Sequence, residues 1–525
     1  MAVPSSVCRA VARGGASVAA RRGAASAAPA AAAAPDAPSA DVRPYLDIPG
    51  PKPLPVVGNI WRFLPVVGPW GGQDMLEVHH TLQSTYGDIV RLSGMPKNRD
   101  MVALYDPVDI EKVYRNEGPW PKREAFGSLN YYRRFINKER YEGSHGLLTT
   151  NEKEWQEFRR GVQGPMLQPR AVAKYTAPID TVASEFIERL REIRDENGLL
   201  PKDADNWFFR WALESIAIIA LDTRLGCLDS QVAGEPQKMI DAVQVLFEGM
   251  FELDIKPSIW KYVSTPMWRK YVNAISTFET VSEKYIQNRV NRLKSKMAEG
   301  GDIGDDLSVL ERLLLANDNP RIAMTMALDM LFAGIDTTSY ATGALLYLLS
   351  RNPDKQEELH AELRRVLPQR DTPVTAERLQ DMKYLRAAIK ESMRMKPVAI
   401  GQLRENPKEG LVLRNYYIPK GVDILLMLAV SGNDPRFVPH AERFMPERWL
   451  KGDDPHAKGH PFATLPFGFG PRICIGKRFA ELEIEVLNAK LLRNFKVEYP
   501  CKGEFQTRLL HVLKSPMTFR LTDRD

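Results

Sequence analysis

The sequence predicts a mainly α-helical protein with small β-sheets. Amphipathic helical patterns recur through residues 170–300. Residues 319–351 predict one long helix, because an Asn-Pro pair opens the segment and a second Asn-Pro pair follows it. Strand-like runs at residues 88–92 and 101–105 indicate a small sheet near the N-terminus. A length of 525 residues would by itself suggest two or three domains.

The first 35 residues differ in composition from the rest of the chain. They hold four arginines, many alanines and serines, and no acid before Asp36. This composition is typical of a mitochondrial transit peptide, with a disordered alanine-rich tail as the alternative. Residues 36–60 are rich in proline and predict a stiff connector, which would leave residues 61–525 as the catalytic domain.

Charge and cysteine content narrow the class of protein. The net charge of +6 is mild for this length and does not indicate nucleic-acid binding. Four scattered cysteines are too few for a disulfide framework, which favours a reducing compartment. The N-terminal stretch holds no run of about 20 apolar residues, the length that a membrane-spanning helix needs.

Residues 467–476 read FGFGPRICIG and place Cys474 in a tight loop. The glycines allow sharp turns, and Pro471 stiffens the loop. Backbone N–H groups in such a loop and the positive charge of Arg472 should favour a thiolate at Cys474, as should the predicted helix that follows Gly476. A rigidly held thiolate is the axial ligand that a haem iron uses as a strong electron donor. For a lone cysteine, a buried structural thiol is the alternative.

The pattern F-x-x-G-x-R-x-C-x-G resembles the signature of the cytochrome P-450 family of haem-thiolate monooxygenases. The resemblance runs from about residue 45 to the C-terminus. It implies the cytochrome P-450 fold, one large domain that binds haem b, with Cys474 as the iron ligand and Phe467 beside the haem. It also implies insertion of one oxygen atom of O2 into a lipophilic substrate, either sterol-like or xenobiotic.

Further haem contacts follow from the same resemblance. Trp155 and Arg159 lie at positions i and i+4 of a predicted helix and so share one face. They match the W-x-x-x-R element whose members hold a haem propionate in the family, a role that suits a forked guanidinium. Arg404 and Arg472 are expected to hold propionates as well. The aromatic-rich residues 118–150 correspond to a variable wall of the substrate pocket.

Residues 333–338, AGIDTT, lie within the predicted long helix and match the family element [AG]-G-x-[DE]-T-[TS]. The resemblance implies that Gly334 leaves space for oxygen above the haem. Thr337 is expected to bond a backbone carbonyl and hold water, and Asp336 to relay protons. A carboxylate in the middle of this apolar helix argues against the alternative of a transmembrane segment.

Glu391 and Arg394 form an E-x-x-R pair, a pattern too common to be informative by itself. Its position before the run FMPERW at residues 444–449 distinguishes it from the other pairs. The resemblance implies that Glu391, Arg394 and Arg448 form a buried ion network behind the haem, with a structural role.

The electron donor is indicated by four cations. Arg386 and Lys390 lie at positions i and i+4, and Lys477 and Arg478 directly follow the cysteine loop. In the mitochondrial branch of the family, matching positions bind an acidic [2Fe-2S] ferredoxin, which an NADPH-dependent ferredoxin reductase reduces. Ordinary solvated surface charge is the alternative.

The N-terminal composition and this resemblance together predict a location in the mitochondrion, on the matrix side of the inner membrane. Residues 257–271 mix aromatic with basic side chains, which suits either a membrane interface or a loop packed on its own protein. The opening PYLDIPG at residues 44–50 is similar to arthropod members.

Two other activities remain open at this stage. One is a haem-thiolate isomerase or dehydratase that needs no external electrons. Retention of Asp336 and Thr337 argues against it, because such an enzyme needs no proton relay. The other is a non-enzymatic haem protein that binds a lipophile.

Overall fold

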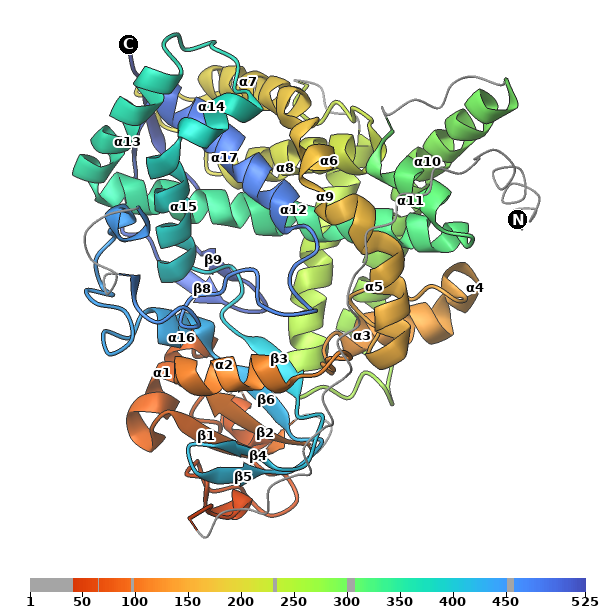
Figure 1. Cartoon of the computed structure of the whole chain (residues 1–525), viewed down its shortest axis with the longest axis vertical. Coiled ribbons are helices and arrows are strands. Elements are labelled where there is room, and N and C mark those ends of the chain that lie inside the picture. Colours follow the sequence, from red (N-terminus) through yellow and green to blue (C-terminus); the bar gives the residue numbers. More distant parts are fainter. Residues whose placement is uncertain (1–40, 65, 96–98, 230–233, 300–306, 451–457) are drawn as a thin grey trace, which may run out of the picture.

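The computed structural model describes residues 41–525 apart from residues 65, 96–98, 230–233, 300–306 and 451–457. Helices dominate this part of the chain, and the largest sheet lies at one end of the molecule (Figure 1). The predicted fold class, mainly α with small sheets, is confirmed.

The helices of the described residues have the following bounds: α1 Met75–Tyr86, α2 Pro107–Asn116, α3 Gly127–Tyr131, α4 Lys138–Tyr141, α5 Glu152–Leu167, α6 Pro169–Ala173, α7 Thr176–Ile193, α8 Ala204–Leu221, α9 Gly234–Met250, α10 Pro266–Ala298, α11 Val309–Ala316, α12 Pro320–Arg351, α13 Pro353–Val366, α14 Ala376–Asp381, α15 Lys383–Met395, α16 Leu428–Gly432 and α17 Lys477–Asn494. Short 3-10 and π-helical turns lie between them: η2 Tyr45–Asp47, η3 Ile60–Phe63, η5 Tyr132–Ile136, η6 Phe251–Ile255 and η7 Pro446–Trp449. The strands are β1 Ile89–Met95, β2 Arg99–Leu104, β3 Gln402–Glu405, β4 Leu411–Leu413, β5 Tyr416–Ile418, β6 Asp423–Leu426, β7 Phe495–Glu498, β8 Phe505–Thr507, β9 His511–Leu513 and β10 Arg520–Asp523.

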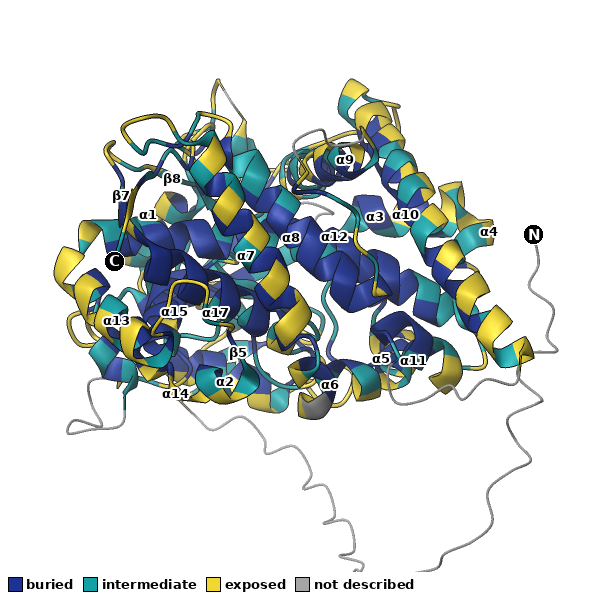
Figure 2. Ribbon diagram, turned by 90° about the horizontal axis from the view of Figure 1, so that it is seen from above, coloured by how far each residue is buried: buried dark blue, intermediate teal, exposed yellow. Residues whose placement is uncertain are grey.

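Helix α12 is the predicted long helix, and it runs through the buried centre of the molecule (Figure 2). Its first turn holds Pro320, and the Asn319 side chain caps it by accepting a hydrogen bond from the backbone N–H of Arg321 at 3.0 Å. Its sides are apolar because α8, α11, α15 and α17 pack around it. Within the described ranges, no helix combines the length and apolar character needed to span a bilayer.

The largest sheet has the strand order β1-β2-β6-β3. Strands β1 and β2 are the two predicted near the N-terminus, and they pair antiparallel. Strand β2 pairs in parallel with β6, which comes more than 300 residues later, because the intervening helices carry the chain away and back. Strand β3 pairs with β6 on the other side and so carries Arg404 to an edge of the sheet.

Part of the predicted connector lies against this sheet. The backbone N–H of Arg91 in β1 donates to the carbonyl oxygen of Pro49 at 2.9 Å, and Arg43 forms a bridge with Tyr416 in β5. Gly50 is needed there, because a Cβ at this position would lie 2.1 Å from the carbonyl oxygen of Arg91. Residues 43–58 therefore pack on the domain. The predicted transit peptide, residues 1–35, lies outside the described residues.

Residues 118–150, where the sequence has few regular patterns, contain α3, η5 and α4. These helices are too short to form from local propensity, so tertiary contacts must hold them. Tyr132 and Tyr141 are buried within the main core, whereas Phe135 is exposed. Phe126 takes a left-handed backbone conformation, φ 55°, at the start of α3.

Candidate active site

The Cys474 loop is closed by its own backbone. The N–H of Cys474 donates to the carbonyl oxygen of Phe467 at 2.9 Å. Gly470 has φ 75°, and a Cβ there would lie 2.3 Å from Oε1 of Glu117. Glycine is thus required at Gly470 both by its conformation and by the approach of Glu117, which follows α2.

The charge state of the Cys474 thiol depends on opposing effects. Burial raises its pKa overall, which outweighs the lowering by the backbone N–H groups of Gly476 and Lys477 and by the cations Arg159 and Arg123. The predicted lowering by backbone N–H groups is present, but burial outweighs it in the folded chain. The strongest nearby cations also differ from the predicted Arg472. A metal ion that replaces the proton would hold the sulfur as a thiolate.

Arg472 packs on Trp155, its guanidinium carbon lying 4.3 Å from the indole centroid. Its Nε donates to the carbonyl oxygen of Pro121 at 2.8 Å, and its Nη2 donates to that of Thr150 at 3.0 Å. Its buried Nη1 has no partner among the described residues. Trp155 lies in α5 and Arg472 in the cysteine loop. Both were predicted to contact the haem, and the structure brings them together.

Arg404 is also buried beside this cluster. Its Nε donates to Oε2 of Glu117 at 2.5 Å, and its guanidinium lies 5.3 Å from the ring centroid of Tyr114. Glu117 was not predicted as a site residue, because nothing in the sequence around it distinguishes it from other glutamates at helix ends.

The cluster has a surplus of positive charge. Burial, together with Arg123 and Arg404, lowers the pKa of Arg472 to about 8. Burial also lowers the pKa of Arg123 to about 10, and that of Arg159 falls in the same direction. Buried Nε atoms of Arg123 and Arg159 have no hydrogen-bond acceptor among the described residues. Such a set of unpartnered donors fits a ligand that carries carboxylates. Arg123 lies in no motif, so the sequence did not indicate it.

In α12, the Thr337 hydroxyl donates to the carbonyl oxygen of Ala333 at 2.7 Å, as predicted. Asp336 is buried, its Oδ1 has no partner among the described residues, and burial raises its pKa to about 7. Gly334 departs from its prediction. It faces α8, where a Cβ would lie 2.8 Å from the Ile216 side chain, so close helix packing is what requires glycine there.

A second buried carboxyl lies nearby, and sequence reasoning missed it. Glu483 of α17 is buried, and the Thr338 hydroxyl of α12 is its hydrogen-bond donor. Burial raises the pKa of Glu483 to about 8, and its Oε1 has no partner in the described part of the chain. A glutamate on an otherwise apolar helix face was the available signal.

The predicted ion network has its three members in contact and fully buried. Arg394 donates to both oxygens of Glu391, at 2.8 and 3.0 Å. Arg448 donates through Nε to Oε1 of Glu391 at 3.0 Å, and the indole N–H of Trp449 donates to Oε2 at 2.8 Å. One carboxylate thus joins α15 to η7.

Comparison with known proteins gives a uniform result. The sequence profile of the family described as cytochrome P-450 matches residues 48–522. The chain belongs to the cytochrome P-450 family. It is 40% identical over 485 residues to the probable mitochondrial cytochrome P-450 301a1 of Drosophila melanogaster, a match that covers 91% of this chain and 87% of that protein.

Two other relatives are also insect proteins. The probable cytochrome P-450 49a1 of Drosophila melanogaster is 37% identical, with 92% of this chain and 84% of that protein covered. The mitochondrial cytochrome P-450 12b1 of Drosophila acanthoptera is 36% identical, with 87% and 85% covered. The predicted resemblance to the mitochondrial, arthropod-type branch is therefore confirmed. The chain is a haem-thiolate monooxygenase whose cofactor is haem b, and the cationic cluster fits the two propionates of that group.

The four cations predicted to bind a ferredoxin lie at the packing of α15 against α17 in this P-450. Lys390 and Arg478 are exposed, and Arg386 and Lys477 are half-buried. The structure adds two half-buried acids to this face. Burial raises the pKa of Glu481, which lies 3.8 Å from Lys477, and raises that of Glu485 to about 7, against the effect of Arg386.

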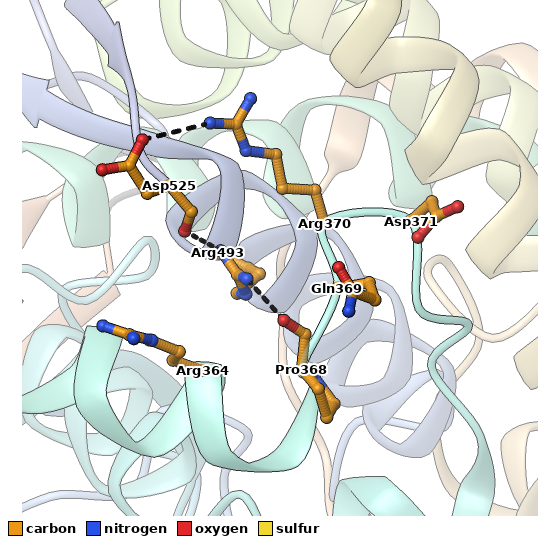
Figure 3. A pocket seen from close by; sticks show the side chains of 7 residues that line it. All are labelled: Arg364, Pro368, Gln369, Arg370, Asp371, Arg493 and Asp525. Atoms are coloured by element: carbon orange, nitrogen blue, oxygen red, sulfur yellow. Dashed lines mark hydrogen bonds and ion pairs between the residues drawn. The ribbon is translucent and has the colours of Figure 1, made fainter.

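A surface cavity of about 390 Å³ lies at the opposite end of α17 from Cys474 (Figure 3). Its walls come from the end of α13, the loop that follows it, and the last residue of the sequence. Arg493, the buried member of this set, donates to the carbonyl oxygens of Leu367 and Pro368 at 2.8 Å each. These contacts join α17 to the loop, and the P-450 site described above lies elsewhere.

Proposed function

We propose that this P-450 hydroxylates a lipophilic substrate, sterol-like or xenobiotic, with electrons from a [2Fe-2S] ferredoxin, and that Cys474 is the axial ligand of its haem iron. The observation that carries the proposal is the convergence of the Cys474 loop with the cationic cluster. Members of that cluster come from residues far apart in the sequence, and their free donors suit the two propionates of haem b.

Haem, when bound, supplies the binding and reductive activation of oxygen. Arg123, Arg159 and Arg472 would hold the propionates through N–H groups that lack an acceptor among the described residues. Trp155 supports the Arg472 guanidinium from one face, and Arg404, which is paired with Glu117, adds a further guanidinium to the cluster. Phe467, whose carbonyl closes the cysteine loop, is part of the proposed haem site.

Asp336 and Thr337 of α12 would manage protons when haem is bound. With a pKa of about 7, the Asp336 carboxyl both accepts and releases a proton near neutral pH. The Oδ1 atom of this carboxyl has no hydrogen-bond partner among the described residues, so it is available for proton exchange. Thr337, which donates to Ala333, keeps its lone pairs free to accept a hydrogen bond from water.

The proposed donor is an acidic ferredoxin, reduced by NADPH through a ferredoxin reductase. Relatives with mitochondrial names and the composition of residues 1–35 support a mitochondrial location. The exposed cations Lys390 and Arg478 support electrostatic docking of an anionic partner beside the cysteine loop.

Attachment to the matrix side of the inner membrane is part of the same proposal. The stretch that the sequence left open between membrane contact and self-packing has side chains that suit each role. Trp260 and Trp268 stack on each other at 4.5 Å between ring centroids, with both rings buried. Ile259, Tyr262 and Val263 point outward, Tyr262 being 91% exposed. Apolar side chains exposed together suit the interface of a bilayer.

The proposal is tested at the iron ligand. A Cys474→His variant should bind haem but lose the red-shifted Soret band of the reduced carbonyl complex, which a thiolate ligand produces. The matched control is Cys501→Ser, since Cys501 is an exposed thiol remote in sequence from the loop. If the band survives in Cys474→His and disappears in Cys501→Ser, Cys474 is not the ligand.

A further inference from the structure

The segment between α2 and α5 joins the cysteine loop to α12. Both of its ends are held by one side chain, because Arg472 donates to the carbonyl oxygens of Pro121 and Thr150. Its middle is held by α12 through a buried ion pair. Nη2 of Arg133, in the π-helical turn η5, lies 2.5 Å from Oδ1 of Asp329.

This ion pair is enclosed, and within the described residues only Nε of its Arg133 guanidinium lacks a hydrogen-bond partner. Only 4% of each side chain is exposed. Nη1 of Arg133 donates to the carbonyl oxygen of His145 at 2.8 Å, and the second oxygen of Asp329 accepts from the backbone N–H of Leu147 at 3.2 Å. The Arg133 guanidinium also lies 4.8 Å from the ring centroid of Tyr141.

The neighbouring backbone is adapted to the pair. Gly146 has φ 85°, and a Cβ there would lie 2.3 Å from Nη1 of Arg133 and 2.6 Å from Oδ2 of Asp329. The chain therefore passes so close to the two charges that only glycine fits. Such close packing fixes the position of Asp329 along and around the α12 axis.

Asp329 precedes Asp336 by seven residues in the same helix, which is close to two full turns. The two carboxyls therefore lie on the same face of α12, about 10 Å apart along the axis. A displacement or rotation of the helix at Asp329 is carried to Asp336 and Thr337, because α12 is continuous between them.

We propose that Arg133 and Asp329 are positioning residues, which set the orientation of Asp336 and Thr337 over the haem and couple it to the wall formed by residues 118–150. This inference rests on the proposed proton-handling role of Asp336 and Thr337. Neither Arg133 nor Asp329 touches substrate or the reacting atoms; they act through the helix.

The tests use Asp329→Asn, Arg133→Met and the conservative Arg133→Lys in the haem-loaded protein. The matched control is Glu283→Gln. Glu283 of α10 lies 2.7 Å from Arg140 of the same segment, and this ion pair is partly exposed. It therefore ties the segment to α10 instead of α12. Thr337→Ala is measured alongside these variants, because it changes the proposed proton-handling pair directly.

Two measurements report on positioning. The first is the dissociation constant of 1-phenylimidazole, a probe that binds haem iron from the side facing α12. The second is hydrogen peroxide released per NADPH consumed with ferredoxin and its reductase, which rises when proton delivery fails. The melting temperature reports on a structural role alone.

We expect Asp329→Asn and Arg133→Met to change the 1-phenylimidazole dissociation constant by about 2- to 30-fold, the range of coupling through packed side chains. The peroxide fraction should rise by at least about twofold, because small misplacements of catalytic groups are costly. Arg133→Lys should lie between these variants and wild type, and Glu283→Gln should match wild type in both measurements.

A fall in melting temperature with both positioning measurements unchanged would overturn the inference. So would failure of all three variants to bind haem, since the pair would then serve folding. If Thr337→Ala itself leaves the peroxide fraction unchanged, the proposed proton-handling role fails. If Thr337→Ala raises it and Asp329→Asn does not, only the positioning inference fails.

Discussion

At the scale of single residues, the site is defined by charges that the protein buries without compensating them. Arg123, Arg159 and Arg472 each keep a buried N–H group without an acceptor among the described residues. Asp336 and Glu483 each keep a carboxyl oxygen that has no hydrogen-bond partner in the described part of the chain. Such groups cost free energy of folding, so they are retained where a ligand or a proton satisfies them.

Glu483 offers a test of this cost by pH. Its pKa is raised by burial from 4.5 to about 8, so the native protein binds more protons than the unfolded chain between these values. The free energy of unfolding must then fall as pH rises through this window. A Glu483→Gln variant lacks the titration, so its stability relative to wild type should increase from pH 5 to pH 8, by at most about 5 kcal/mol.

The measurement is urea unfolding of the haem-loaded protein at several pH values across that window. Glu299→Gln, at the exposed end of α10, is the control and should leave the pH dependence of wild type unchanged. Parallel pH profiles for Glu483→Gln and wild type would show that Glu483 ionises as readily in the native protein as in the unfolded chain.

At the scale of elements, one carboxylate organises the contact of α15 with η7. Glu391 accepts from Arg394 on its own helix and from Arg448 and Trp449 on the turn. All three charged side chains are at most 1% exposed. Removing either arginine leaves Glu391 with the other arginine as a cationic partner, whereas removing the Glu391 charge takes from both arginines the carboxylate that they share.

This asymmetry predicts an order of effects. Glu391→Gln should lower the free energy of unfolding by about 3–5 kcal/mol, because it strands buried charge. Arg448→Met should cost about 1–3 kcal/mol, since Arg394 still pairs with the carboxylate. Urea unfolding checks the order. The exposed pair of Lys284 with Glu235 gives the control, and Lys284→Met should change stability by less than about 1 kcal/mol. Equal losses in the two network variants would contradict this account.

At the scale of the whole molecule, motifs of fixed spacing made the fold and most site residues predictable. Cys474, Asp336, Thr337 and the E-x-x-R pair lie in short runs whose spacing reflects one loop or one helix turn. Arg123 is different, because it joins the site only through tertiary structure.

Long-range pairs carry no local signal. Arg133 and Asp329 are separated by 196 residues, and nothing at either position indicates the other. The same holds for Glu117 with Arg404, which are 287 residues apart. At the cysteine loop, the backbone N–H groups that lower the pKa of Cys474 could be predicted from the pattern, whereas the burial that raises it is a property of the folded domain.

The face beside the cysteine loop contains cations that the sequence predicted and acids that it did not. This balance of charge predicts opposite effects of two substitutions on ferredoxin binding. Lys390→Glu should weaken binding of an acidic [2Fe-2S] ferredoxin, because it replaces an exposed cation. Glu485→Gln should strengthen binding, because a half-buried acid close to Arg386 and Lys390 is neutralised. Both effects should shrink between about 0.02 M and 0.2 M salt as screening increases.

Isothermal titration of the haem-loaded protein with the ferredoxin measures both effects. Lys296→Glu makes the same charge change near the end of α10, on the other side of the molecule from α15 (Figures 1 and 2), and should leave the affinity close to wild type. If Lys296→Glu weakens binding as much as Lys390→Glu does, net charge rather than this face governs the encounter. If Glu485→Gln leaves the affinity unchanged at low salt, the acids of α17 lie outside the contact. Glu485 of α17 and Lys390 of α15 lie close together where the two helices pack. Only a partner that binds over this contact should change its affinity in both variants, and in opposite directions.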